Sequence, residues 1–304
     1  MFDYSNVAVL IPCRDEAETI SQVVGGFKAV LPNASIFVYD NCSTDDTQKI
    51  AKKAGAIVRN ENRKGKGNVV RRMFAEVEAD FYFLVDGDST YDSTIAPQML
   101  KCLIDENLDM LSIARLGEKD SYRSGHRLGN FLLTKTVKVI FGNGLNDMLS
   151  GYRIFTRRFV KTFPAKSNGF EIETELSVHS LEMKIPIAEY SAKYVDRPQG
   201  SVSKLSTYLD GLKILLMIFR LFFLLKPIVS FSIVSAVLAM ISILIGWFQV
   251  ILPLLVNGVI DKYPSVILSS SLMILSILIF VTGIVVNSIS NVRKEQFRFF
   301  YLRW

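Results

Sequence analysis

Apolar segments of three to five residues alternate with longer amphipathic segments over the first third of the chain. The apolar segments predict β-strands at residues 7–11, 36–39, 56–58, 81–85 and 110–114. Pro12 is expected to end the first strand. Between the first two strands, apolar side chains recur at the spacing of one helix face, at Ile20, Val23, Val24 and Phe27. Strands that alternate with helices predict an α/β domain with a mostly parallel, doubly wound sheet.

The last third of the chain has a different pattern. Residues 205–226 are amphipathic, which predicts a helix at a membrane surface or, alternatively, one packed on the first domain. Two uncharged segments follow, and each exceeds the roughly 20 apolar residues that span a bilayer. They predict a transmembrane helical hairpin with spans at about 228–252 and 265–289. The expected division is therefore a first domain at 1–204, a juxtamembrane helix at 205–226 and a hairpin with its tail at 227–304.

The net charge of +6 is concentrated near the predicted spans. Residues 1–192 contain 24 Lys and Arg against 25 Asp and Glu, whereas residues 193–304 contain 11 against 4. Basic residues that flank apolar spans favour contact with anionic lipids over nucleic acid. They also predict that the first domain and both termini are cytoplasmic. The expected membrane is a bacterial-type inner or plasma membrane. The aromatic and basic tail after residue 296 is expected to lie at the membrane interface.

The cysteines exclude some kinds of site. Cys13, Cys42 and Cys102 are odd in number and show no CxxC spacing. They predict reduced thiols in a cytosolic domain rather than a disulfide framework or a zinc site.

Acidic residues directly follow the strand at 81–85, in the sequence Asp86-Gly87-Asp88. Ligands of open α/β sheets bind beyond the carboxyl ends of the strands. Two carboxylates there could share a divalent ion, because Mg²⁺ typically takes one or two carboxylates plus substrate phosphates. The alternative is an Asp-rich turn without function.

Two further features belong to the same predicted edge of the sheet. Asp40 ends the second strand, and Asp15-Glu16 follow the first. The loop Lys64-Gly65-Lys66-Gly67 places cations and bare backbone at a helix N-terminus, which suits a diphosphate. A solvated turn is the alternative for this loop.

In their order and spacing, these motifs resemble the family-2 glycosyltransferases of GT-A fold, which is Rossmann-like. Within that family, the chain is similar to the polyprenyl-phosphate and dolichyl-phosphate glycosyltransferases over about residues 5–205. The sequence differs from the usual pattern at two positions. The family's Asn-Glu pair is Asp15-Glu16 here, and its paired Asp-Asp after the second strand is Asp40-Asn41.

The resemblance implies roles in donor binding. It implies that Asp40 contacts the uracil or ribose, that Pro12 and Glu16 shape the nucleotide pocket, and that Lys66 approaches the diphosphate. It implies that Asp86 lies near the ribose and the metal, and that Asp88 is the main ligand of Mg²⁺ or Mn²⁺. Glu171 and Glu173 match the pattern near the donor sugar, although carboxylates at a helix N-terminus also stabilise the helix dipole.

Acceptor binding is assigned to the second half of the domain. Asp147-Met148-Leu149-Ser150-Gly151-Tyr152-Arg153 resembles the subgroup's Asp-x-x-Ser-Gly-[Phe/Tyr]-Arg motif. The resemblance implies that Asp147 is a base or orients the acceptor, and that Ser150 and Arg153 hold phosphate. Four further cations are expected at the acceptor phosphate: Arg123, Arg127, Arg197 and Lys204. Surface-loop and linker roles are the alternatives for these four. His126 is expected to be a surface residue and His179 a structural one.

The sequence thus predicts a membrane-anchored inverting enzyme that transfers a hexose from a nucleotide diphosphate sugar to polyprenyl phosphate, undecaprenyl or dolichyl. UDP-glucose or a related UDP-hexose is the expected donor, and the product is expected to feed cell-surface glycan assembly. The alternatives are another lipid or polysaccharide acceptor, GDP-mannose as donor, and a membrane-bound nucleotide-binding scaffold without catalysis. The oligomeric state is left open.

Overall fold

The structure is a computed structural model that describes residues 4–116, 124–142, 144–193, 207–260 and 262–303. It divides into two compact units. The first comprises Met1–Ile218 together with Phe300–Trp304, and the second comprises Phe219–Phe299. The functional division expected at 204/205 and 226/227 stays a prediction.

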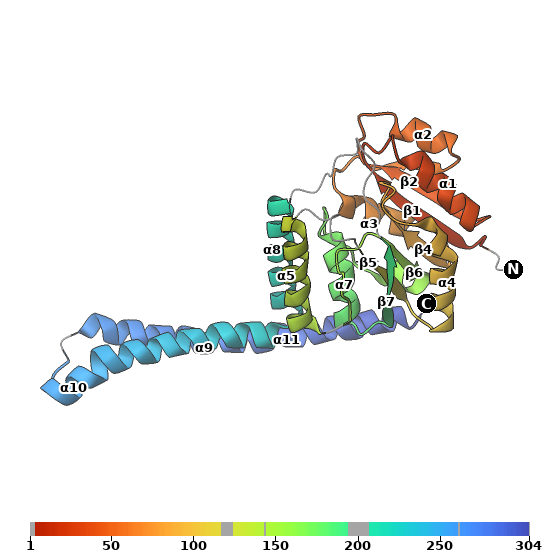
Figure 1. The fold of residues 1–304 in the computed structure, drawn as a ribbon. Helices are drawn as coiled ribbons and strands as arrows, with labels where there is room; N and C mark the ends of the chain where they lie inside the picture. Colours follow the sequence, from red (N-terminus) through yellow and green to blue (C-terminus); the bar gives the residue numbers. More distant parts are fainter. Residues whose placement is uncertain (1–3, 117–123, 143, 194–206, 261, 304) are drawn as a thin grey trace. The chain divides into compact units, whose positions relative to one another are not determined.

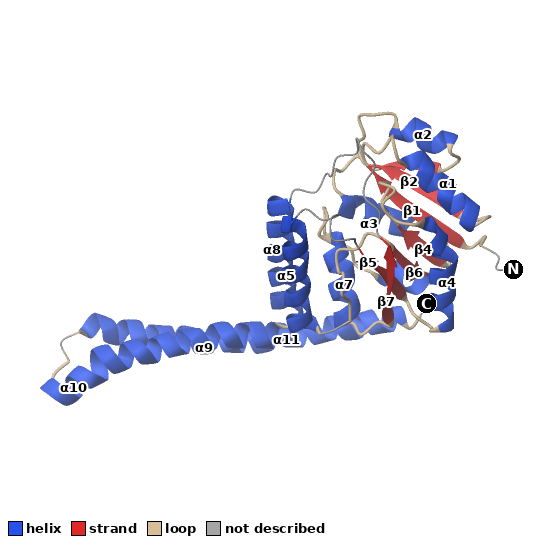
Figure 2. Cartoon of the chain, viewed as in Figure 1, coloured by secondary structure: helices blue, strands red, loops and turns tan. Residues whose placement is uncertain are grey.

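The first unit is built around one seven-stranded sheet (Figures 1 and 2). Its strands, in the order in which they lie side by side, are β3 (Ile57–Asn60), β2 (Ser35–Asp40), β1 (Val7–Cys13), β4 (Phe81–Leu84), β6 (Arg153–Thr156), β5 (Met110–Leu116) and β7 (Ile187–Lys193). All strands are parallel except β6, which is antiparallel to both of its neighbours. The five predicted strands and the α/β class are therefore confirmed.

Helices cover both faces of the sheet. The helices of the first unit are α1 (Ile20–Val30), α2 (Thr47–Lys53), α3 (Lys66–Glu76), α4 (Ala96–Asp105), α5 (Ser124–Phe141), α6 (Arg157–Thr162) and α7 (Ile172–Glu182), with a 3-10 turn at Ser93–Ile95. A further helix, α8 (Thr207–Leu225), begins in the first unit and ends in the second. The apolar stripe predicted in α1 is buried and joins α4 and alternate side chains of β1, β2 and β4 in one core. On the other face, Phe74 of α3 packs on Phe155 of β6, and Phe155 stacks on Phe159 of α6.

The first strand continues through Pro12 to Cys13, so the expectation that Pro12 ends it is wrong. The pairing of β1 with β4 stops at Leu10, whereas its pairing with β2 continues, with Pro12 opposite Tyr39. Alternate residues of a strand direct their backbone groups to opposite neighbours. Leu10 accepts a hydrogen bond from Val85 N on the β4 side, so Pro12 faces that side too. The missing N–H of the proline lies where the ladder has already ended.

Strands β6 and β7 were not predicted from the sequence. The direction of β6 matters for the site, because Arg153 at its start pairs with Leu84 at the end of β4. The loop that precedes β6 therefore reaches the edge of the sheet where Asp86 and Asp88 follow β4. A parallel strand at this place would have put that loop at the opposite edge.

Within the first unit, Tyr301 contacts Asp109, the residue before β5. Its hydroxyl donates a hydrogen bond to the Asp109 carboxylate, and its ring lies 4.4 Å from the guanidinium of Arg158. The same carboxylate accepts hydrogen bonds from Arg158 Nη2, at 2.6 Å, and from Thr156 Oγ1, at 2.6 Å. Tyr301 thus packs on Asp109 and Arg158, and the membrane-interface position of the tail stays a prediction.

The second unit contains two long apolar helical stretches. The first ends at the predicted turn at Asn257-Gly258, and the second begins shortly after it. The first combines α9 (Pro227–Gly246), a π-helical turn (Trp247–Ile251) and α10 (Leu252–Asn257), and the second is α11 (Tyr263–Tyr301). Gly258 has φ +74°, a left-handed conformation that suits glycine after a helix. An 18-residue apolar segment within each stretch has a mean hydropathy of 2.7 and 2.5, respectively, so both are candidate membrane spans by length and composition.

Small and polar residues, not apolar ones, are buried in these helices. Those of α9 are Pro227, Ser230, Ser235 and Ser242, and those of α11 are Ser276, Gly283 and Ser290. Ser235 and Ser276 each donate a hydrogen bond to the other's carbonyl, both at 2.9 Å. A Cβ on Gly283 would lie 2.5 Å from Cβ of Phe231, so the glycine permits close approach. Most of the large apolar side chains are exposed, which is typical of helix pairs packed within lipid.

Candidate functional site

Acidic side chains lie where β1, β2 and β4 end. Asp40 is the last residue of β2 and pairs with Cys13 of β1, while Asp86 and Asp88 follow β4. Because these three strands are parallel and adjacent, their carboxyl ends form one edge of the sheet. The predicted grouping of these loops at one edge is confirmed.

Lys66 lies between two carboxylates at this edge. Its ammonium contacts Asp86 and lies 2.5 Å from Glu173 Oε1. The side chains of Lys66 and Glu173 are 9% and 7% exposed, whereas that of Asp86 is 30% exposed. Burial alone would lower the pKa of Lys66, but attraction by Asp86 and Glu173 outweighs it and raises the pKa above its usual value. Lys66 is therefore a permanently charged, buried cation.

The glycines of the Lys64–Gly67 loop allow close packing against another loop. Gly65 has φ +125°, and a Cβ there would lie 2.1 Å from the carbonyl oxygen of Asn168. A Cβ on Gly67 would lie 2.2 Å from the carbonyl oxygen of Ser167. The amide of Gly67 donates to Gly169 O at 3.1 Å, and that of Asn68 donates to Asn168 O at 3.3 Å. The expectation of bare backbone for a diphosphate is thus wrong for these two amides, because protein carbonyls occupy them.

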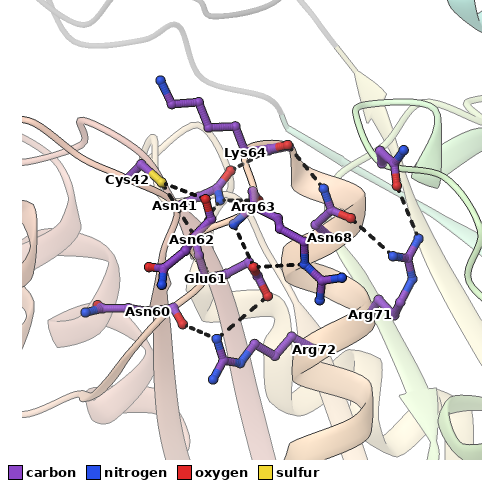
Figure 3. A network of polar contacts seen from close by, with 12 residues as sticks. Asn41, Cys42, Asn60, Glu61, Asn62, Arg63, Lys64, Asn68, Arg71 and Arg72 are labelled. Atoms are coloured by element: carbon purple, nitrogen blue, oxygen red, sulfur yellow. Dashed lines mark hydrogen bonds and ion pairs between the residues drawn. The ribbon is translucent and has the colours of Figure 1, made fainter.

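Asn41 fixes this loop from the other side, as the polar network in Figure 3 shows. Its side-chain amide donates to the carbonyls of Glu61 and Arg63, both at 2.9 Å, and its oxygen accepts from Gly65 N at 2.7 Å. A carboxylate has no proton to donate to the two carbonyls. Asparagine in place of the family's second aspartate therefore has a structural reason in this chain.

Asn41→Asp should loosen the Lys64–Gly67 loop. The variant loses two hydrogen bonds, one buried and one partly buried, and sets a charge against two carbonyl oxygens. We therefore expect a loss of about 1–3 kcal/mol in unfolding free energy. Thermal unfolding measures that loss, and titration with UDP measures its effect on the nucleotide. Asn62→Asp is the matched control, because Asn62 is exposed and the change in charge is the same. Equal stability of the two variants would contradict the assigned role.

Asp40 presents one unpaired oxygen. Its Oδ2 accepts hydrogen bonds from Ser43 N at 3.1 Å and Gln48 Nε2 at 3.0 Å. Its Oδ1 is buried and has no hydrogen-bond partner among the described residues. Nearby, the amide of Glu16 donates to Thr47 Oγ1 at 2.8 Å, which joins the loop after β1 to the start of α2. Pro12 is partly exposed beside these groups.

Asp88 is buried and held by its own turn. Its Oδ1 accepts hydrogen bonds from Thr90 Oγ1 at 2.6 Å and Thr90 N at 3.2 Å. Across the part of the chain that the structure describes, no group of three or more His, Cys, Asp or Glu side chains is placed to hold a metal ion. Two hard carboxylates completed by phosphate oxygens of a substrate fit Mg²⁺ or Mn²⁺, whereas a site made of protein ligands alone does not.

The loop before β6 packs directly on Asp86. A Cβ on Gly151 would lie 2.2 Å from Asp86 Oδ2, so only glycine leaves room for this carboxylate. The amide of Gly151 also donates to the hydroxyl of Tyr91 at 2.9 Å, and that hydroxyl lies 3.5 Å from Ser150 Oγ. The predicted acceptor motif therefore meets the predicted donor site at Asp86.

Arg153 and Ser150 are both fully buried, which differs from their expected contact with an acceptor phosphate. The guanidinium of Arg153 donates to the carbonyls of Met148, Ser150 and Glu173 at 2.7–3.1 Å. Burial lowers its pKa to about 10, against attraction by surrounding acidic groups, so it remains protonated at neutral pH. Arg153 thus orders the loop before β6 from within the protein.

Asp147 forms a two-point ion pair with Arg115 at the end of β5. Arg115 Nε lies 2.5 Å from Oδ2, and Nη2 lies 2.8 Å from Oδ1. Both oxygens of Asp147 are engaged, which favours an orienting role over that of a base. The sequence reasoning missed Arg115. The rule that identified Asp86 could have found it, because Arg115 also lies at the carboxyl end of a parallel strand.

The carboxylates around α7 have different roles. Glu171 precedes the helix, and its Oε2 is buried without a hydrogen-bond partner among the described residues. Glu175, which the sequence reasoning also missed, accepts hydrogen bonds from the amides of Lys166 and Ser167. These two hydrogen bonds order the loop at residues 166–169, which packs on Gly65 and Gly67. Sequence spacing offered no signal for it, because the two loops are about 100 residues apart.

The remaining predicted acceptor residues are not placed. Arg123, Arg197 and Lys204 lie outside the described residues, and Arg127 belongs to α5 but its side chain lies outside the described part. His126 is on the same helix with the same limit. His179 packs edge-on against Phe163, with ring centroids 5.2 Å apart, in agreement with a structural role.

The chain is similar to known proteins of one family. The family model of glycosyl transferase family 2 matches residues 8–163, just over half of the chain. Glycosyltransferase AglJ of Haloferax volcanii is 34% identical over 220 residues, which cover 70% of this chain and 71% of that protein. Dolichyl-phosphate hexose transferase of the same organism is 23% identical over 211 residues, 69% of this chain and 91% of that protein.

A solved structure shows the same fold. Glucosyl-3-phosphoglycerate synthase of Mycobacterium tuberculosis, in complex with Mn²⁺, UDP-glucose and phosphoglyceric acid, matches with a TM-score of 0.59 at 20% identity. The match covers 70% of this chain and 78% of that one. The chain has the GT-A fold, and it belongs to glycosyl transferase family 2.

Proposed function

We propose that the protein is a membrane-anchored inverting glycosyltransferase that moves a hexose from a nucleotide diphosphate sugar to polyprenyl phosphate. The meeting of two loops at Asp86 carries this proposal. Lys66 contacts this carboxylate from the predicted donor loop, and Gly151 packs on it from the predicted acceptor motif. One site can therefore bring both substrates together.

A UDP-hexose is the proposed donor. The unpaired Oδ1 of Asp40 supports this choice, because a buried acceptor oxygen requires a donor such as a base N–H or a ribose hydroxyl. Pro12 and Glu16 flank that position, and Glu171 and Glu173 lie toward the sugar in the proposed arrangement. A related fold binds UDP-glucose with Mn²⁺ in its solved structure, which supports the donor class.

Asp86 and Asp88 would hold Mg²⁺ or Mn²⁺ together with the donor phosphates. When bound, the ion supplies positive charge that stabilises the departing diphosphate. Lys66 contributes a second, fixed positive charge beside the same carboxylate. Asp88 is oriented for this task by the hydrogen bonds that Thr90 donates to its Oδ1.

The acceptor phosphate needs little activation. Its second pKa is about 6, so its oxygen is already anionic at neutral pH and can attack the anomeric carbon directly. The bond from that carbon to the nucleotide diphosphate breaks as the new one forms, with inversion. Asp147 would orient the acceptor through Arg115, which adds a cation at this edge. Arg123, Arg127, Arg197 and Lys204 remain the proposed contacts to the acceptor phosphate.

The hairpin is proposed to anchor the enzyme in a plasma or inner membrane. Serine and glycine fill its interior while apolar side chains face outward, which a soluble core helix would reverse. The basic flanks of the hairpin support a cytoplasmic position for the enzyme domain and both termini. A long isoprenoid acceptor stays in the bilayer, so an anchored enzyme meets its head group. The name of a relative, dolichyl-phosphate hexose transferase, supports this acceptor class.

A donor and acceptor screen tests the function. Purified full-length protein is incubated with Mg²⁺ or Mn²⁺, polyprenyl phosphate and one of several UDP-hexoses or GDP-mannose, and the lipid-linked sugar is measured. We expect product with a UDP-hexose and none when the lipid is a polyprenol without phosphate. Product with a polysaccharide or another lipid would redirect the acceptor assignment. Nucleotide binding without any transfer would support the scaffold alternative.

A further inference from the structure

We propose that Lys66 is a built-in counter-ion of Asp86 that opposes binding of a divalent cation until the donor diphosphate arrives. The inference rests on the proposed donor site and deepens it. It sets the order in which the nucleotide and the metal ion bind: Lys66 leaves Asp86 when the diphosphate offers it new hydrogen-bond acceptors. The carboxylate then becomes available to the cation that accompanies the nucleotide.

The geometry gives Lys66 two alternative partners. Its ammonium contacts Asp86 on one side and Glu173 on the other. Asp86 is the more exposed of the two carboxylates, so a cation from solvent reaches the cluster at Asp86. A divalent ion there would share the carboxylate with a buried ammonium, and like charges at such short range repel strongly.

Glu173 makes the departure of Lys66 feasible. A buried ammonium that lost its only partner would be strongly destabilising. The second oxygen of Glu173, Oε2, is buried and has no hydrogen-bond partner among the described residues. Lys66 can therefore leave Asp86, keep a carboxylate partner and donate another hydrogen bond to a phosphate oxygen. The packing of Gly65 and Gly67 on residues 167–169 holds the backbone still, so the movement is confined to the side chain.

The test measures Mn²⁺ binding, not turnover, with the detergent-solubilised full chain and UDP as the nucleotide probe. Lys66→Met should bind Mn²⁺ about tenfold more tightly than the parent protein when no nucleotide is present, which is within the usual range of coupling between sites. Glu173→Gln should act in the opposite direction, about fivefold weaker, because Lys66 then has Asp86 as its remaining partner. A structural role alone would weaken binding in both variants.

Two variants control this test. Lys64→Met removes the same charge from an exposed position of the same loop and should leave Mn²⁺ affinity within about twofold of the parent value. Should Lys66→Met fail to fold, Lys66→Met combined with Glu173→Gln removes the buried pair together and still frees Asp86. In that double variant, Mn²⁺ should again bind more tightly than in the parent protein.

The outcomes separate the two proposals. Unchanged or weaker Mn²⁺ binding by folded Lys66→Met, while the parent protein binds Mn²⁺ with UDP, overturns the counter-ion role and leaves the donor site intact. Absence of Mn²⁺ binding to the parent protein even with UDP overturns the proposed metal site itself. Tighter binding in Lys66→Met together with weaker binding in Glu173→Gln supports the inference.

Discussion

Asp88→Asn should lower glycosyl transfer by about three orders of magnitude while the protein stays folded. The substitution keeps an oxygen that can accept the hydrogen bonds from Thr90, so the turn after β4 is preserved. It removes the negative charge through which Asp88 would hold a divalent ion beside the donor diphosphate. Removal of one group that stabilises transition-state charge typically costs about 10²–10³ in rate, and loss of the metal as well places the effect at the upper end.

A matched control uses the next turn of the chain. Asp92 accepts hydrogen bonds from Thr94 N at 2.8 Å and Thr94 Oγ1 at 2.7 Å, the same Asp-x-Thr pattern in an exposed position. Asp92→Asn therefore makes the same chemical change without touching the proposed metal ligands. Rates of lipid-linked sugar formation and circular dichroism are measured for both variants. Full activity in Asp88→Asn would refute the metal role.

Arg153→Ala should destabilise the protein by about 3–5 kcal/mol, because it removes a buried cation from among hydrogen-bonded partners. The guanidinium donates hydrogen bonds to the carbonyls of Met148, Ser150 and Glu173 and to the hydroxyl of Ser177. Each buried acceptor left without a donor adds its own cost of desolvation. Denaturant unfolding in detergent, followed by a signal from the first unit, measures the change.

The comparison variant is Arg157→Ala, four residues further along the chain. Arg157 pairs with Glu78 at 2.9 Å, where the side chains are 43% and 60% exposed, so its removal should cost at most about 1 kcal/mol. If Arg153→Ala has normal stability but binds the acceptor less tightly, the result would support the phosphate contact that the sequence motif implies. Equal destabilisation of both variants would show that charge, not burial, is responsible.

Much of the donor half was predictable because its signals are local. The strands before Asp40 and Asp86 are short apolar runs, and acidic residues directly after them mark the edge where parallel strands end. The motifs around Asp15, Asp40, Lys66 and Asp86 occur in the order typical of the family. These features depend on neighbouring residues, so the sequence contains them without knowledge of tertiary contacts.

The acceptor half was harder because its side chains are set by distant contacts. Arg153 follows Ser150 and Gly151, a context that suggests phosphate, yet the antiparallel pairing of β6 with β4 buries it. The glycines at 65 and 67 suggested an open anion loop, whereas residues 167–169 fill that space. Neither contact leaves a trace in local spacing. Both follow from sheet topology and from loops that meet across the fold.

The contact of Tyr301 with Asp109 has a consequence for biogenesis. The two residues are 192 positions apart, and both long apolar helices are synthesised between them. Domains generally fold as units from the N-terminus as the chain emerges from the ribosome. The enzyme domain therefore cannot form the contact of Tyr301 with Asp109 and Arg158 until both apolar helices have been synthesised. The last contact of the enzyme domain thus forms only after the membrane hairpin has been synthesised.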